Sequence, residues 1–282
     1  MDAMSDHQQP QQIEDGLMQN TRKFLAIAGA LTLLGWAHTA QSSPFDISDW
    51  NCEGNCGTAA ADGDISLSPF GSSEYGWIST ANGVDTEGLG IGNETTGSTI
   101  TSPLFDANQG DELSFNFNYV TSDGGGFSDY AWALLLDENL EPAAQLFTAR
   151  TNPGGNTVPG FELPEPDADV ALDPSETPII AGAPEWSPLG NSSGSCFGDG
   201  CGYTDWIESV FSFDEDGTFA LQFGVVNWND EAFQSGLAFD GATIAGRDIG
   251  DDAPGEIPLP ATLALFLTGL AAMVGIRRKH TV

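Results

Sequence analysis

The sequence predicts an all-β protein: an antiparallel β-sandwich of jelly-roll type, flanked by an N-terminal signal helix and a C-terminal transmembrane helix. Segments in which apolar and polar residues alternate recur between turns rich in Gly, Asp and Asn, which is typical of half-buried strands. Helical periodicity is nearly absent outside the two ends. The region from 42 to 256 of the 282-residue chain is long enough for one sandwich domain.

The clearest strand is expected at residues 112–120 (ELSFNFNYV), where apolar side chains would share one face and polar side chains the other. Residues 130–136 (YAWALLL) are apolar on both faces, as in a central strand. Trp132 and Trp228 fall in strand-like segments and are expected in the core. Further strands are expected at 75–80, 98–105, 207–213, 218–228 and 237–244.

Residues 151–203 interrupt this succession of expected strands and are rich in Pro, Gly, Asp and Glu. A loop of that length is uncommon in a compact domain and is usually either functional or poorly ordered. Trp186 lies within it, so we expect this ring to be exposed, where it would stack on a sugar. The sandwich is expected to span residues 42–246, and residues 247–256 to form a linker.

Charge excludes several classes of function. The chain has 41 acidic and 7 basic residues and a formal net charge of −34, and Arg150 and Arg247 are the only basic residues between positions 42 and 256. Such a domain lacks the basic surface that binds nucleic acid or anionic lipid. It also contains no Lys and no His, so a lysine Schiff base, a catalytic triad with histidine and a histidine-ligated zinc ion are not expected.

Residues 1–40 are predicted to be an N-terminal extension and a secretory signal peptide. A short basic region, Arg22 and Lys23, precedes an apolar run that ends at Trp36. Small residues at the first and third positions before the cut favour cleavage after Ala37. The run is short for a bilayer span, which favours cleavage over the alternative, an uncleaved anchor helix.

Residues 257–276 (IPLPATLALFLTGLAAMVGI) carry no charge and as a helix would span about 30 Å, the thickness of the hydrocarbon layer. Arg277, Arg278 and Lys279 follow at once, and such a cluster stops transfer and stays on the cytoplasmic side. The pattern predicts an exported domain held at its C-terminus by a membrane helix. A buried core helix is the alternative, against which the uniformly apolar surface and the basic flank both argue.

Residues 257–282 resemble a PEP-CTERM sorting signal, found in Gram-negative bacteria that make exopolysaccharide. Pro258 and Pro260 open the block, the apolar helix follows, and the basic residues 277–279 close it, whereas Leu259 replaces the glutamate of the Pro-Glu-Pro form. The resemblance implies that an exosortase, a membrane-embedded transpeptidase-like protease, cleaves the signal after the secretion machinery has exported the chain. It also implies an inner-membrane intermediate and a final location at the cell surface, in the outer envelope or in the extracellular matrix.

The segments 122–135, 223–230 and 235–244 resemble uncharacterised PEP-CTERM ectodomains with jelly-roll sandwiches. Similar sandwiches serve as carbohydrate-binding and adhesion modules. This likeness concerns the fold, and a fold does not fix a function.

Four cysteines occur as two close pairs, Cys52 with Cys56 and Cys196 with Cys201. An even number in an exported protein predicts disulfides, and we expect two local bridges because each pair lies in a Gly-rich segment. A zinc site made of all four thiolates is the alternative, but the spacings are longer than the usual C-x2-C.

Acidic loops flanked by Gly are candidates for calcium, which prefers carboxylate and carbonyl oxygens. The candidate ligands are Asp62, Asp64, Asp123, Asp129 and Asp240. The alternative is that these residues provide surface charge and turn chemistry. The large excess of acidic residues is equally typical of a protein from a saline habitat, where it keeps the surface hydrated.

The sequence therefore predicts a non-enzymatic protein of the cell surface or matrix, whose sandwich binds extracellular polysaccharide, calcium or both. One alternative is a secreted enzyme that acts on polysaccharide with a pair of carboxylates. Another is a structural protein anchored by a plain single membrane span.

Overall fold

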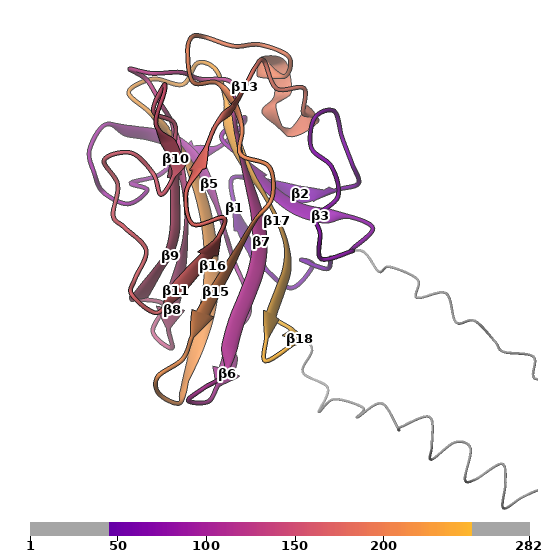
Figure 1. Ribbon diagram of the computed structural model, residues 1–282, viewed down its shortest axis with the longest axis vertical. Helices are drawn as coiled ribbons and strands as arrows, with labels where there is room; N and C mark the ends of the chain where they lie inside the picture. Colours follow the sequence, from indigo (N-terminus) through magenta and orange to yellow (C-terminus); the bar gives the residue numbers. More distant parts are fainter. Residues whose placement is uncertain (1–44, 250–282) are drawn as a thin grey trace, which may run out of the picture. The chain divides into compact units, whose positions relative to one another are not determined.

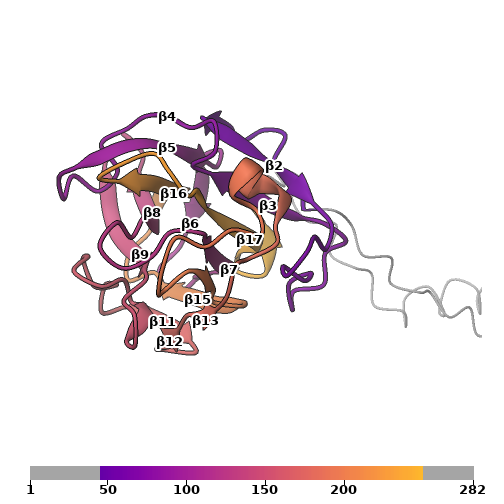
Figure 2. The ribbon, with the colours of Figure 1, turned by 90° about the horizontal axis from the view of Figure 1, so that it is seen from above.

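The computed structural model describes residues 45–249 and shows an all-β domain built from two antiparallel sheets, which face one another across a shared core (Figures 1 and 2). The signal-peptide and sorting-signal predictions concern residues outside this range. Within residues 45–249, no helix has the length and apolar character needed to cross a membrane.

The first sheet has the strand order β1-β5-β16-β8-β9, with β4 beside β5 and β6 beside β16. Its strands are β1 (Asn51–Glu53), β4 (Val84–Asp85), β5 (Glu94–Thr101), β6 (Phe105–Ala107), β8 (Tyr130–Asp137), β9 (Pro142–Arg150) and β16 (Gly217–Trp228).

The second sheet has the order β11-β15-β7-β17-β3-β2, and β14 and β18 add short pairings to β7 and β17. Its strands are β2 (Asn55–Ala59), β3 (Tyr75–Ser79), β7 (Glu112–Thr121), β11 (Val170–Asp173), β13 (Ile180–Ala181), β14 (Gly202–Tyr203), β15 (Ile207–Ser212), β17 (Ser235–Ile244) and β18 (Arg247–Asp248). The pair β17–β18 and the buried Ile249 extend the domain beyond the expected boundary at residue 246.

The long strands change sheet repeatedly along the chain. From β3 onward they alternate between the two sheets, except for the hairpin of β8 and β9 within the first. The connections β7–β8 and β16–β17 therefore both cross between the sheets, and a backbone hydrogen bond from Ser122 to Gln234 joins them. This arrangement places several loops, distant in sequence, at one end of the sandwich.

Aromatic side chains fill the space between the sheets. The alternation in β7 is confirmed, because Leu113, Phe115, Phe117 and Tyr119 are all buried. Phe117 stacks on Phe147 of β9 with ring centroids 3.7 Å apart.

Two predictions about the core need correction. Trp132 is buried, but on the outer face of the first sheet, where it packs with Tyr130 and Val226 instead of with the inter-sheet core. Trp228 is only partly buried and packs against that same outer cluster. Both tryptophans point outward because they alternate with residues of β8 and β16 that fill the core.

The segment 151–203 is more structured than a single long loop. It contains β10 (Asn156–Val158), β12 (Thr177–Pro178), which pairs with β10, the strands β11, β13 and β14, and the 3₁₀ segment η1 (Ser187–Ser192).

The prediction that Trp186 is exposed is wrong. Its side chain is 1% exposed, and its indole N–H donates to the hydroxyl of Tyr75 at 2.9 Å. The proline-rich segment around it lies against the second sheet, so the ring is covered and cannot stack on a ligand.

Both predicted disulfides are confirmed: Cys52–Cys56 and Cys196–Cys201. The first joins the two sheets, because Cys52 lies in β1, which pairs with β5, and Cys56 lies in β2, which pairs with β3. Gly54 turns the chain between them at a φ of 99°, and a Cβ there would lie 2.3 Å from the Ser98 hydroxyl. Two disulfides are typical of a protein that matures in an oxidising, extracytoplasmic compartment.

Candidate ligand-binding site

Loops from four parts of the sequence meet at one end of the sandwich. The connection β7–β8 contacts the cystine loop, which comprises residues 196–201, through the amide of Gly125, which donates to the Asp199 carbonyl at 2.9 Å. It contacts the β16–β17 connection through the amide of Ser122, which donates to the Gln234 carbonyl at 3.1 Å. A Cβ at Gly125 would lie 2.7 Å from Pro153, so the loop after β9 is packed against the same place.

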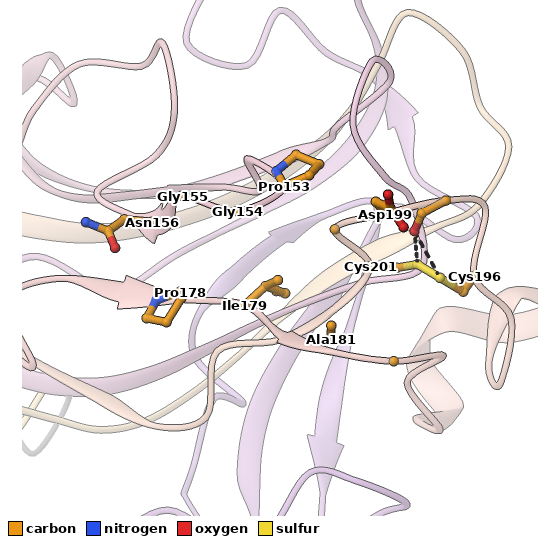
Figure 3. Close-up of a pocket in the computed structure, with 13 residues that line it drawn as sticks. Pro153, Gly154, Gly155, Asn156, Pro178, Ile179, Ala181, Cys196, Asp199 and Cys201 are labelled. Atoms are coloured by element: carbon orange, nitrogen blue, oxygen red, sulfur yellow. Dashed lines mark hydrogen bonds between the residues drawn. A yellow bond between two sulfur atoms is a disulfide. The ribbon is translucent and has the colours of Figure 1, made fainter.

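A groove of about 940 Å³ opens between the β10–β12 pair and the cystine loop (Figure 3). Pro153 and Asn156 lie on one side, Pro178 and Ile179 on the other, and the cystine with Asp199 at one end. Glycines, peptide groups and small side chains make up the rest of the lining. Asp199 is the one charged residue among the described residues of the lining, so the groove offers mainly backbone donors and acceptors.

Buried hydroxyl groups without partners lie on the elements that form this groove. Thr157 in β10 and Thr177 in β12 are buried, and so is Thr151 at the end of β9, yet none of these hydroxyls has a hydrogen-bond partner within the described structure. A buried polar atom left unpaired costs about 1–3 kcal/mol. None of these three residues lines the groove itself.

Three phenylalanines form an aromatic cluster beside the groove. Phe197, within the cystine loop, has ring centroids 5.5 Å from Phe127 and 5.3 Å from Phe233. Phe127 and Phe197 are 38% and 48% exposed, which places an apolar surface on a strongly acidic domain. Each ring comes from a different loop, so no local sequence pattern reveals the cluster.

Asp123 and Asp129 are buried in the β7–β8 connection behind these loops. Oδ1 of Asp123 accepts from the amide of Gly124 at 2.7 Å. Burial raises the pKa of Asp123 to about 7; the Gly124 hydrogen bond opposes this shift, and the charge of Asp230 adds to it.

Asp129 is more completely enclosed. Its Oδ1 accepts from the amide of Trp228 at 2.9 Å, and its Oδ2 accepts from the Ser235 hydroxyl at 2.6 Å. Burial raises the pKa of Asp129 well above its usual value, although the Ser235 hydrogen bond lowers it, and the charge of Asp123 raises it further. The charge of Asp123 therefore acts on Asp129 in an interior without a basic partner among the described residues.

The other calcium candidates lie elsewhere. Asp62 and Asp64 accept hydrogen bonds from the amides of Ser187 and Glu185, each at 2.8 Å, and so fix the entry to η1. Asp240 is buried and hydrogen-bonded to Ser68. The five predicted ligands thus fall at three separate places, and residues 45–249 contain no group of three or more His, Cys, Asp or Glu that could hold a metal ion.

No protein-family model matches the chain, and no curated protein is significantly similar to it in sequence. Among solved structures, the K1 cleaved adhesin domain of Lys-gingipain from Porphyromonas gingivalis W83 has 13% identity and a TM-score of 0.33, over 71% of this chain and 94% of that domain. The K3 domain of the same protein has 12% identity and a TM-score of 0.30, over 69% of this chain and 93% of that domain.

The enzymatically active domain of tailspike protein 4 from bacteriophage CBA120 has 12% identity and a TM-score of 0.31, over 71% of this chain. The match spans only 19% of the length of that tailspike chain. TM-scores this low do not establish a shared fold.

Proposed function

We propose that this protein is an exported, non-catalytic ligand-binding protein, and that its sandwich binds extracellular polysaccharide at the groove and the aromatic cluster. The observation that carries the proposal is the cluster of the exposed Phe127 and Phe197 with the half-buried Phe233, beside a groove lined mainly by peptide groups. Aromatic rings pack on the apolar faces of sugars, and peptide groups bond their hydroxyls. We infer a jelly roll from the way the long strands alternate between the sheets.

The binding proposal is tested with the protein purified from its host and with the polysaccharide of the same host. Phe197→Ala removes the central ring of the cluster, and we expect it to weaken binding about tenfold, since one stacked ring contributes about 1–1.5 kcal/mol. Phe161→Ala is the matched control, because Phe161 is 44% exposed but does not belong to the cluster. Equal binding by both variants and the wild type contradicts the proposal.

The proposal includes sorting. The N-terminal signal is cut after Ala37, the C-terminal helix holds the protein at the inner membrane, and an exosortase reading Pro258 and Pro260 releases it to the surface or matrix. Support comes from the sequence pattern and from the two disulfides. Intact mass and cell fractionation test it: loss of both ends with release from the membrane is expected, whereas a membrane-bound chain still ending at Val282 contradicts it.

A calcium ion near Asp123 is a second candidate function. Asp123 and Asp129 are both buried, and the charge of Asp123 raises the pKa of Asp129, while the charge of Asp230 raises the pKa of both; no cation among the described residues balances them. Calcium would supply that charge, with carboxylate and carbonyl oxygens as ligands. We expect added Ca²⁺ to raise the melting temperature of the wild type and to leave that of Asp123→Asn unchanged. Equal effects on both proteins would contradict a site at Asp123.

The same carboxyl groups support a non-catalytic role. Both oxygens of Asp129 are engaged by the amide of Trp228 and the hydroxyl of Ser235, and the residue is 1% exposed. A glycosidase pair instead presents both carboxyl groups to the bond that is cleaved. We therefore expect the purified protein to bind polysaccharide without shortening it, which size-exclusion chromatography of the polymer tests.

A further inference from the structure

Arg150 has no carboxylate partner among the described residues of a very acidic domain. Its side chain is 6% exposed, and its guanidinium lies over the ring of Trp228, 4.3 Å from the centroid. The Nε–H donates to the Ser128 carbonyl at 3.0 Å, and neither terminal nitrogen has a partner within residues 45–249. These two nitrogens are not among the fully buried unpartnered atoms, so they reach the surface.

This arrangement needs an explanation, because a guanidinium withdrawn from water is usually paired with an anion. Arg150 and Arg247 are the only basic residues between positions 42 and 256, so the chain offers carboxylates in great excess. The stacking on Trp228 and the bond to Ser128 instead fix the plane of the guanidinium and leave its outer edge open. A fixed, open guanidinium edge binds a carboxylate through two parallel hydrogen bonds.

The neighbours of Arg150 form a row across the outer face of the first sheet. Tyr130 of β8 pairs with Arg150 of β9, and Trp228 of β16 pairs with Glu94 of β5. Oε1 of Glu94 accepts from the Tyr130 hydroxyl at 2.7 Å, and the Trp228 indole N–H donates to the Gly92 carbonyl at 2.7 Å. Oε1 of Glu94 also accepts from the amide of Ile91 at 2.7 Å, and the carboxylate remains able to accept further hydrogen bonds.

Burial raises the pKa of Glu94, but the hydrogen bonds from Tyr130 and from the neighbouring backbone outweigh it, so the net shift is downward. Glu94 is therefore ionised at neutral pH. The face thus combines the hydrogen-bond donors of the Arg150 guanidinium with an ionised acceptor at Glu94, and Trp228 stacks on the first and pairs with the second across β16 and β5.

The geometry points to a second binding site, in which Arg150 binds the carboxylate of an acidic sugar and Glu94 accepts hydrogen bonds from its hydroxyls. A uronic acid residue carries one carboxylate and several hydroxyl donors, which matches this set of groups. A peptide C-terminus offers the carboxylate but not the hydroxyls. None of these residues lines the groove of Figure 3, so the site is separate from the proposed polysaccharide groove. Acidic residues more than about 8 Å away act weakly on the bound carboxylate because salt screens them, whereas the charge of Glu94 within the site opposes its binding.

The test is calorimetric titration of the full chain with trigalacturonate, with its methyl ester, and with a short peptide acid. We expect trigalacturonate to bind, and the methyl ester and the peptide acid to bind at least about tenfold more weakly. Equal binding of the ester, or no binding of trigalacturonate at millimolar concentration, overturns the proposal. Equal binding of the peptide acid overturns the assignment to a sugar. These comparisons use the wild type alone, so they do not depend on how well a variant folds.

Variants then locate the site. Arg150→Met is expected to weaken trigalacturonate binding about tenfold to a hundredfold, the effect of a charge-assisted hydrogen-bonded pair. Arg247→Met is the matched control, because it removes the same charge from an exposed position in β18 and should leave binding unchanged. Arg150→Lys keeps the positive charge but removes the paired N–H donors of the guanidinium. Wild-type affinity in this variant would contradict a contact made through two parallel hydrogen bonds.

Discussion

Asp129 and Ser235, which are 106 residues apart, meet in the buried end of the sandwich, where the Ser235 hydroxyl donates to Oδ2 of Asp129 at 2.6 Å. The same hydroxyl lies 2.7 Å from that of Thr121 at the end of β7. The connections β7–β8 and β16–β17 are thus joined through a buried carboxyl group. The groove and the aromatic cluster rest on these loops.

The first prediction concerns pH. The pKa of Asp123 is about 7 in the folded protein against its ordinary value of 3.8, so the folded state holds this proton more strongly than the unfolded state. The contribution to stability is complete below about pH 4 and is lost as the pH rises to about 7. Asp123→Asn should therefore flatten the decline in unfolding free energy between pH 4 and 7, measured by urea denaturation.

The control for this prediction is Asp214→Asn. It removes the same charge from an exposed turn between β15 and β16, so it corrects for general repulsion among the acidic residues. A decline equally steep in Asp123→Asn and in Asp214→Asn would show that the buried carboxyl group does not cause it.

The second prediction concerns the disulfide that joins the sheets. Replacing Cys52 and Cys56 with Ser opens a very short loop, for which chain entropy gives a loss of about 2 kcal/mol in unfolding free energy. For a domain of this size that corresponds to a fall in melting temperature of about 4–8 °C. Calorimetry measures it, and an unchanged melting temperature would mean that the hydrogen bonds of β1 and β2 already hold the two edges together.

The third prediction concerns the outer face of the first sheet. A Cβ at Gly224 would lie 2.1 Å from the ring of Trp132, so Gly224→Ala must displace a buried indole. We expect a loss of about 1–3 kcal/mol in unfolding free energy, the usual effect of overpacking. Gly182→Ala is the control, because a Cβ there meets no atom within 4 Å. Equal stability of the two variants would contradict the packing described for Trp132.

The fourth prediction concerns Trp186. Trp186→Phe leaves the buried hydroxyl of Tyr75 without its indole partner, so we expect a loss of about 1–3 kcal/mol in unfolding free energy. Polysaccharide binding should not change, because the ring does not reach the surface. Weakened binding at unchanged stability would contradict the buried position.

The strands that the sequence predicts well are those with a strong local signal. Residues 112–120 and 130–136 correspond closely to β7 and β8 because apolar side chains alternate or run continuously there. Strand β9 (PAAQLFTAR) was not expected, since it begins with Pro and Ala and does not alternate. Strand β5 begins at Glu94, earlier than the expected residue 98, because its first residues are polar and only partly buried.

The site was less predictable than the fold. Phe127, Phe197 and Phe233 come from three loops, and only the tertiary fold brings them together. Arg150 was noted in the sequence for its rarity, but its position over Trp228 depends on the pairing of β9 with β8 and of β8 with β16. Trp186 was misplaced because a proline-rich context predicts exposure, whereas this segment packs on a sheet.

The central claim is that the groove of Figure 3 binds polysaccharide, and hydrogen–deuterium exchange tests it most directly. The full chain is compared with and without the polysaccharide of its host. We predict slower exchange of amides in residues 153–156, 178–182 and 196–201 when the polymer is present, with little change in β11 and β15, which do not line the groove. Unchanged exchange in the groove, or protection confined to other segments, would contradict the claim.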